Sequence, residues 1–290
     1  MARRITASLF ALFVLLGAVS AAPAQQSYRG FDRNVYPGDA ALAALRKSFS
    51  YTGYWLNDPP GEVRNSWAGK RAILKRYGFG FLVLYNGRSD KELKAAQAKG
   101  TSAAALGAQD AKAAVKAAAR EGFERGVLIF LDQEEGGRLL PAQAAYLFAW
   151  MDAVRAGGDR PGVYCSGIAV PEGKGRAIST AEEIAEHLSA FHSSPNRGPE
   201  GALWIANDAC PPSPGCTLAN PALSRAFPPA LRRFAVAWQY AQSPRRRQFS
   251  ASCPANAAPD GNCYAPGLPQ GADSFVDLDT ADSPDPSEAR

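Results

Sequence analysis

Short apolar runs alternate with amphipathic stretches along most of the chain. The runs that predict β-strands are 28–34, 51–57, 79–85, 127–132, 162–166, 203–207, 235–240 and 274–278. Apolar residues at helical spacing predict helices over 37–49, 66–77, 91–123, 141–157, 179–191 and 221–233, with 91–123 expected to break near Gly100 and Gly107. Alternating strands and helices imply parallel strands with right-handed crossovers. The pattern therefore favours a (β/α)8 TIM barrel, an α/β fold, over an open doubly wound sheet.

The two ends of the chain differ from this pattern. Arg3 and Arg4 precede an apolar run over 7–19 and a small-residue segment at 22–24, which is typical of a secretory signal peptide. An uncleaved membrane anchor is the alternative, although the run is short for a bilayer. We expect a signal peptide over 1–24, a single-domain barrel over 25–280 and a disordered tail over 281–290, rich in Pro, Ser and acids. The mature protein is then secreted or periplasmic, in the cell envelope, without a stable membrane span.

Composition excludes several classes of protein. With 46% hydrophobic and 20% charged residues, the chain is neither disordered nor a multi-span membrane protein. Loss of Arg3 and Arg4 leaves 30 basic and 27 acidic residues, a balance that does not indicate nucleic-acid binding. We expect a monomer. No metal or organic cofactor is indicated.

The five cysteines of an exported chain favour disulfides over metal ligands. The local pairs Cys210–Cys216 and Cys253–Cys263 are the simplest arrangement, which leaves Cys165 as a free, buried thiol. The sequence alone does not fix this pairing.

Polar residues follow most of the predicted strands, at the ends where TIM barrels carry their sites. These residues are Asp32, Asn57, Asn86, Asp132 with Glu134, Ser166, Asn207 with Asp208, Gln239, and Asp277 with Asp279. A single Asp at such a position is ordinarily a helix cap or a loop hydrogen bond. Acids on so many strands around one opening are costly unless they are used or paired, so as a set they favour a site.

The remaining residue types narrow the chemistry. The chain has two histidines, His187 and His192, and His187 falls on the apolar stripe of a predicted outer helix, where a packed imidazole is expected. This argues against a Ser-His-Asp triad and a His-based zinc site. The sequence contains no Gly-x-Ser-x-Gly elbow, phosphate loop or dinucleotide fingerprint. Carboxylate chemistry remains.

The segment 131–135, Leu-Asp-Gln-Glu-Glu, is the sharpest candidate for that chemistry. Residues two apart on a strand share a face, so Asp132 and Glu134 point the same way. Neighbouring acids raise the pKa of one of them, and a protonated carboxyl can donate to a leaving alcohol. Glycoside hydrolysis needs such an acid and a second carboxylate across the sugar, for which Asp32, Asp277 and Asp279 are available.

Several other residues near the strand ends are candidates for substrate binding. Aromatic side chains stack on sugar faces, although many will simply pack the barrel. The candidates are Tyr54, Tyr85, Tyr164, Trp204 and Tyr240, together with the polar residues Asn57, Gln239 and Asp279.

The order of these short motifs along the chain resembles the family 25 glycoside hydrolases, lysozymes that cleave peptidoglycan. The motifs are Gly30-Phe31-Asp32, Asp132-x-Glu134, 163–167 (VYCSG), 203–206 (LWIA), 238–240 (WQY) and 276–279 (VDLD). The stretches 51–57, 59–62, 65–67 and 78–87 are more similar to a bacterial glycoside-hydrolase-like family, the domain of unknown function 1906. The resemblance covers essentially the whole mature chain.

The resemblance implies a role for each matching acid. Glu134 would be the general acid/base, Asp132 its neighbour and modulator, and Asp32 and Asp277 would flank the scissile sugar. In the lysozyme family the acetamido group of the substrate is proposed to assist, so no enzyme nucleophile is required nearby. The segment 54–62 departs from the lysozymes, so the substrate need not be peptidoglycan, and Glu135 remains an alternative to Glu134.

Three functions are therefore open. The first is a secreted glycosidase acting on cell-wall or related polysaccharide. The second is a catalytically weak or inactive glycan-binding envelope protein on the same barrel. The third is a structural or regulatory envelope protein that uses the barrel as a scaffold.

Overall fold

A computed structural model describes residues 26–192, 201–207, 227–242, 265, 268 and 275–288. The expected signal peptide over 1–24 and four of the cysteines (Cys210, Cys216, Cys253 and Cys263) lie outside these residues, so their structure and pairing stay predictions. The fifth, Cys165, is free and buried as expected. Of the helices within these ranges, none combines the length and apolar character needed to cross a bilayer.

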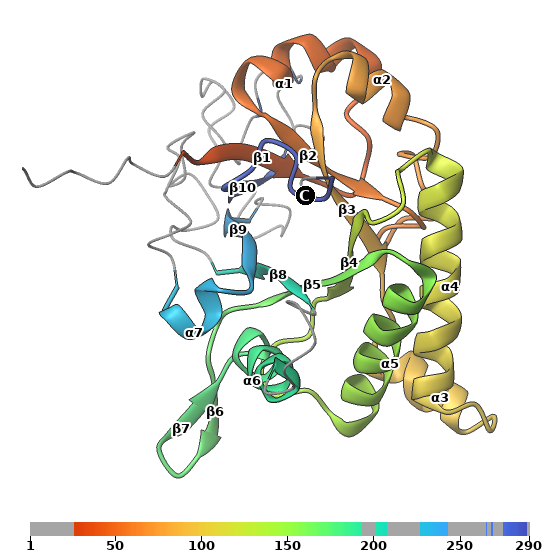
Figure 1. The fold of residues 1–290 in the computed structure, drawn as a ribbon, viewed down its shortest axis with the longest axis vertical. Coiled ribbons are helices and arrows are strands. Elements are labelled where there is room, and N and C mark those ends of the chain that lie inside the picture. Colours follow the sequence, from red (N-terminus) through yellow and green to blue (C-terminus); the bar gives the residue numbers. More distant parts are fainter. Residues whose placement is uncertain are drawn as a thin grey trace, which may run out of the picture.

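Eight strands close into a barrel (Figure 1), as the sequence predicts. Around the ring they follow the order β1, β10, β9, β8, β5, β4, β3, β2. Their bounds are β1 Tyr28–Asp32, β2 Tyr51–Trp55, β3 Gly80–Asn86, β4 Leu128–Gln133, β5 Arg160–Ser166, β8 Ala202–Ala206, β9 Ala235–Ala241 and β10 Asp277–Ala281. Their apolar residues form the buried core.

The last strand corrects the all-parallel prediction, because β10 runs antiparallel to both of its neighbours. It also lies three residues later than the expected strand over 274–278. A parallel strand needs a long crossover, usually a helix, to return to the starting end of the barrel, and the segment between β9 and β10 shows no helical periodicity in the sequence. The chain instead re-enters the barrel at the end where β9 leaves it.

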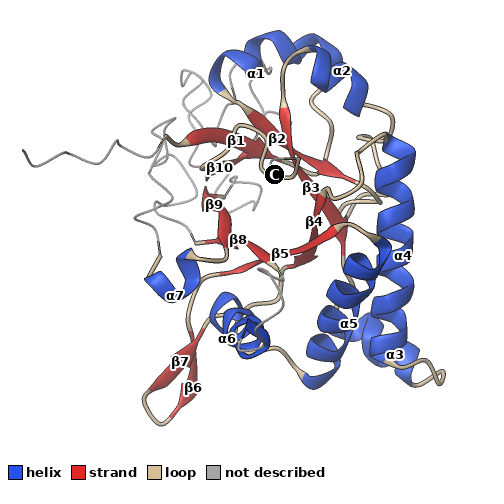
Figure 2. Cartoon of the chain, in the orientation of Figure 1, coloured by secondary structure: helices blue, strands red, loops and turns tan. Residues whose placement is uncertain are grey.

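The helices lie outside the ring of strands (Figure 2). They are η1 Asp39–Ala41, α1 Leu42–Ser48, α2 Arg71–Arg76, α3 Asp90–Gln97, α4 Ala103–Glu121, α5 Pro141–Gly157, α6 Thr180–His192 and α7 Pro229–Arg232. The break expected near Gly100 separates α3 from α4, but Gly107 lies inside α4. A Cβ on Gly107 would stand 2.2 Å from the Tyr146 carbonyl oxygen, so this glycine allows α4 to approach α5 closely.

Local signals place two further features. The expected capping box at the start of α6 is present, since the Glu182 backbone N–H donates to Ser179 Oγ and the Glu182 carboxylate accepts from the Ser179 N–H. On the same helix His187 stacks on Phe148, with ring centroids 3.5 Å apart, which confirms the packed imidazole.

A hairpin of β6 (Val170–Gly173) and β7 (Arg176–Ile178) was not expected; it projects from the barrel after β5 (Figure 1).

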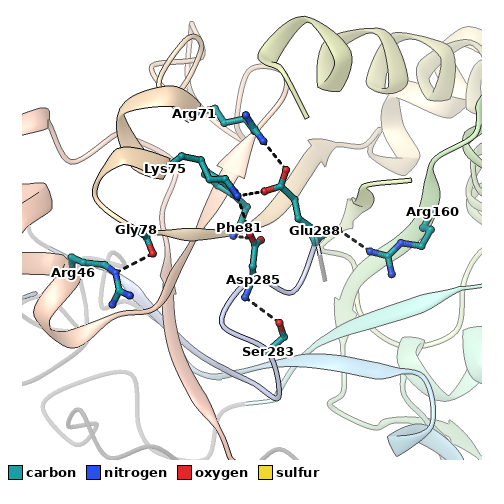
Figure 3. A network of polar contacts seen from close by, with 10 residues as sticks. Arg46, Arg71, Lys75, Gly78, Phe81, Arg160, Ser283, Asp285 and Glu288 are labelled. Atoms are coloured by element: carbon teal, nitrogen blue, oxygen red, sulfur yellow. Dashed lines mark hydrogen bonds and ion pairs between the residues drawn. The ribbon is translucent and has the colours of Figure 1, made fainter. Parts of the chain in front are cut away.

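The C-terminal segment 282–288 corrects the prediction of a disordered tail. It crosses the end of the barrel at which β3, β4 and β5 begin (Figure 3). The fully buried Ser287 accepts through Oγ from the Val83 N–H and donates from its N–H to the Phe81 carbonyl. Its carbonyl accepts from the Leu128 N–H and from the Arg160 guanidinium. Glu288 pairs with Arg71 and Lys75 at 2.6 Å each. The segment therefore closes the end of the barrel opposite the carboxyl ends of the parallel strands.

Candidate functional site

The predicted acids converge at the open end of the barrel, hereafter the mouth. Asp32 is the last residue of β1 and pairs in register with Asp277, the first residue of the antiparallel β10. Asp132 pairs with Tyr164 of β5 on one side and Asn86 of β3 on the other. Since register partners point to the same face of a sheet, Asp32 stands with Asp277, and Asp132 with Tyr164.

Tyr164 shows that these acids share one environment. Burial raises the pKa of its hydroxyl, and the charges of Asp32, Asp132, Asp277 and Glu134 raise it further. A phenol responds in this way when negative groups surround it, because its own ionised form is disfavoured. Three strands, β1, β4 and β10, therefore supply or lead into four carboxyl groups around one tyrosine.

Asp132 is buried, and its Oδ1 has no hydrogen-bond partner among the described residues. Burial raises its pKa well above the usual range, and the charges of Glu134 and Asp32 add to this effect. A desolvated carboxyl beside two acids keeps its proton to higher pH. Within the Asp132–Glu134 pair, Asp132 is thus a carboxyl with a raised pKa, and burial contributes more to this than the neighbouring acid.

Glu134 and Glu135 are separated by their surroundings. Both follow the end of β4 and both are exposed. Glu135 turns to the helices: its carboxylate accepts from the Gln143 amide of α5 and from the Asp90 N–H at the start of α3. Glu134 instead acts electrostatically on Asp132 and Tyr164. The structure thus brings Glu134, and not Glu135, to the acid cluster.

Gln239 on β9 links the two halves of the site. Its Nε2 donates to Asp32 Oδ2 at 2.9 Å, and its Oε1 accepts from the Tyr164 hydroxyl at 2.8 Å. Gly53 on β2 leaves room for the acid, since a Cβ there would stand 2.7 Å from Asp32 Cβ. The Gln239 amide therefore fixes Asp32 by a hydrogen bond, and Gly53 leaves the space that the Asp32 side chain occupies.

Three predicted substrate contacts lie too deep to meet a substrate. Asp279 pairs with Gly30, two residues below Asp32 on β1, and is fully buried. Trp204 is buried beside it and donates from Nε1 to Asp279 Oδ1 at 3.0 Å. Tyr240 is also buried, and its pKa is raised by burial and by Asp279. Asp279 and Trp204 thus support the site from below, whereas Tyr240 packs against Trp238 of its own strand.

Two predicted aromatic contacts lie outside the barrel. Tyr54 packs against Trp67, Phe81 and Phe123, and its hydroxyl donates to Glu121 of α4. Tyr85 is buried on the outward face of β3, where burial and then the charge of Asp110 raise its pKa to about 12. Both alternate with inward residues on their strands, which the sequence reading overlooked.

Asn57 lies at the rim rather than at the acids. Its Oδ1 accepts from the Asn86 N–H at 2.7 Å and its Nδ2 donates to the Asn86 carbonyl at 3.1 Å. It thereby ties the loop after β2 to the end of β3. Its polar groups are used in this bridge, so it shapes the mouth.

Sequence reasoning missed Tyr51, which lies inside the barrel. It is fully buried, and after burial the charges of Asp279 and, more weakly, Asp32 raise the pKa of its hydroxyl. Alternation along β2 with Gly53 would have indicated its inward position. Within the described ranges, no three His, Cys, Asp or Glu side chains are arranged to hold a metal ion.

Comparison with solved structures shows the same barrel in other proteins. An uncharacterized protein from B. stearothermophilus is 20% identical, with a TM-score of 0.56 over 88% of this chain and 95% of that one. The Tat-secreted protein Rv2525c of Mycobacterium tuberculosis is 14% identical, with a TM-score of 0.50 over 92% and 100%. The Clostridium perfringens spore cortex lytic enzyme SleM is 15% identical, with a TM-score of 0.50 over 89% and 68%. No curated protein matches the sequence.

A family model matches residues 54–208, which include the end of β2, the strands β3 to β8 and the Asp132–Glu134 pair. The match bears out the resemblance to glycoside-hydrolase-like proteins that the motifs indicate. The chain belongs to the family of the Rv2525c-like, glycoside hydrolase-like domain.

Proposed function

We propose that the protein is a secreted glycosidase that cleaves cell-wall, peptidoglycan-like polysaccharide by carboxylate acid/base catalysis. The observation that carries the proposal is the gathering of Asp32, Asp132, Glu134 and Asp277 around Tyr164 at the mouth. The glycoside-hydrolase-like family and a fold shared with a spore cortex lytic enzyme support it.

Glu134 is assigned as the general acid/base because it is the exposed member of the cluster. It gives its proton to the glycosidic oxygen as the bond from that oxygen to the anomeric carbon breaks. A water molecule then adds to the anomeric carbon and returns a proton to Glu134. Substrate and water can reach this side chain directly.

The other acids of the cluster have different roles. Asp132 stands next to Glu134, and the two carboxyl groups act on each other electrostatically, so Asp132 is the neighbour and modulator of the general acid/base. Asp32 and Asp277 lie across the mouth, paired in register. An anion at that position stabilises the positive charge that develops on the sugar ring in the transition state.

The test compares Glu134→Gln with Glu135→Gln on purified peptidoglycan, with release of reducing ends as the readout. Loss of a general acid lowers the rate by about 10²- to 10⁴-fold. We expect this loss for Glu134→Gln and a much smaller change for Glu135→Gln, whose carboxylate contacts α3 and α5. Thermal unfolding checks that both variants fold.

Undiminished cleavage by Glu134→Gln would remove the assigned role. Wall polymer that binds to the wild-type protein without release of reducing ends would instead assign a glycan-binding envelope protein on the same barrel. Absence of both binding and cleavage would favour a scaffold function.

A further inference from the structure

Among the described residues, Asp279 is an acid of the barrel interior that no substrate can touch. It is fully buried and lies opposite Gly30, one inward position below the Asp32–Asp277 pair. Gly30 has no side chain, so the space beside Asp279 on β1 is filled by the Tyr51 ring, which a Cβ on Gly30 would meet at 1.9 Å. Asp279 must therefore act through its neighbours or not at all.

The groups around Asp279 provide one donor and several acids. Trp204 of β8 donates from Nε1 to Oδ1, whereas Oδ2 is buried without a hydrogen bond of ordinary geometry to a described residue. Asp32 on β1 and Asp277 on β10 both act on it electrostatically, and its own charge in turn raises the pKa of the Tyr51 and Tyr240 hydroxyls. An ionised Asp279 would be a second negative charge beside Asp32. It would be desolvated and would lack a hydrogen bond to one of its oxygens, which is costly.

We propose that Asp279 is a neutral carboxylic acid that directs its proton to Asp32 and, together with Gln239, fixes Asp32 as the permanent anion of the site. Asp279 is thus a positioning residue rather than a catalytic one. This inference rests on the proposed function for its catalytic meaning, but the protonation state of Asp279 does not depend on that function.

The polarity of the hydrogen bonds agrees with this assignment. The Tyr164 hydroxyl donates to Gln239 Oε1, which leaves the Gln239 amide N–H as the donor to Asp32. The Trp204 N–H likewise donates to Asp279, which leaves an Asp279 hydroxyl to donate onward. Both chains of donors end at Asp32, and a carboxylate that accepts two hydrogen bonds favours its ionised form.

Burial and the charge of Asp32 also raise the pKa of Asp279 well above the usual range, the direction that a retained proton requires. Ketosteroid isomerase uses a carboxylic acid in the same chemical state, held neutral by an apolar site so that it can donate a hydrogen bond.

The first experiment detects the proton directly. Infrared difference spectra of wild type against Asp279→Asn at pH 7 should show the carbonyl stretch of a protonated carboxyl, shifted in D₂O. Asp132→Asn is the matched control, because it removes the carboxyl near the mouth whose pKa is likewise raised well above the usual range. If Asp279→Asn fails to fold, the protonated band must still be present in Asp132→Asn. A carboxylate band for Asp279, or no protonated band in Asp132→Asn, would overturn the inference.

The second experiment uses the pH dependence of glycan cleavage. Loss of the donor in Asp279→Ala should raise the pKa of Asp32 and move the acid limb of kcat/KM to higher pH by about one to two units, the size of one charge-assisted hydrogen bond. Asparagine also donates, so Asp279→Asn should restore the wild-type limb. A limb that moves to lower pH in either variant would mean that an ionised Asp279 had been removed, and would overturn the inference.

The two proposals fail separately. A protonated Asp279 in a protein that cleaves no glycan would sustain the inference about Asp32 and refute the glycosidase. An ionised Asp279 in an active enzyme would do the reverse.

Discussion

The C-terminal segment 282–288 makes a measurable contribution to stability through one hydroxyl group. The Val83 N–H of β3 donates to Ser287 Oγ at 2.9 Å, and Ser287 is fully buried. Ser287→Ala removes the acceptor and leaves this buried N–H unpaired. An unsatisfied buried donor costs about 1–3 kcal/mol, so we expect the free energy of unfolding to fall by about 2 kcal/mol.

Urea unfolding measures this loss. With an m value of about 3 kcal/mol/M for a domain of this size, a loss of about 2 kcal/mol lowers the midpoint by roughly 0.7 M. Ser283→Ala is the matched control, because its Oγ accepts from the Asp285 N–H in a more exposed turn of the same segment. We expect it to cost less than about 1 kcal/mol.

Removal of the whole segment extends the test. Ser287 makes four hydrogen bonds to β3, β4 and β5, and at about 1 kcal/mol each their loss should destabilise the barrel by about 4 kcal/mol. If truncation after Ala281 leaves the midpoint unchanged, or if Ser287→Ala equals Ser283→Ala, the segment does not close the barrel as described.

Three further predictions concern the site and its boundary. Tyr54→Phe should cost about 1–2 kcal/mol of stability, through loss of the Glu121 hydrogen bond, while leaving KM for wall polymer unchanged; a raised KM would return Tyr54 to the substrate site. In Gly53→Ala the new Cβ would press on Asp32, so we expect a lower kcat, or a free energy of unfolding lower by about 1–3 kcal/mol where the core does not relax. Wild-type kinetics together with wild-type thermal unfolding would refute the close approach. The folded pKa of Asp132 is raised above its unfolded value, so stability is lost as pH rises through the folded pKa. Asp132→Asn should therefore gain stability relative to wild type as pH rises above the unfolded pKa, and urea midpoints that differ by the same amount at all pH values would contradict this.

Periodicity predicted the barrel because most of its strands and helices carry their own local signals. The capping box at Ser179, the start of α5 at Pro141 and the apolar strand β4 all lie where the sequence places them. The strand ends also indicated the acids correctly, since Asp32 and Asp132 terminate or nearly terminate strands.

The errors among the predicted substrate contacts have one common cause, which is that the face and depth of a strand residue depend on its register with distant strands. Tyr54 and Tyr85 are near strand ends, but alternation turns them to the helices. Asp279 and Trp204 face inward, yet they lie below the mouth. Alternation shows which residues of one strand share a face, but an aromatic residue does not show which face is inward or how deep it lies, because it is equally suited to either face.

The direction of β10 accounts for both ends of the barrel. Asp277 begins this strand and reaches the mouth only because the strand is antiparallel; in a parallel strand the same residue would lie at the closed end. The same direction brings the chain out at the opposite end after Ala281, where Ser287 can bond to β3 and β4. A parallel β10 would release this segment at the mouth, beside the substrate. One reversed strand therefore supplies an acid to the site and a closure to the far end of the barrel.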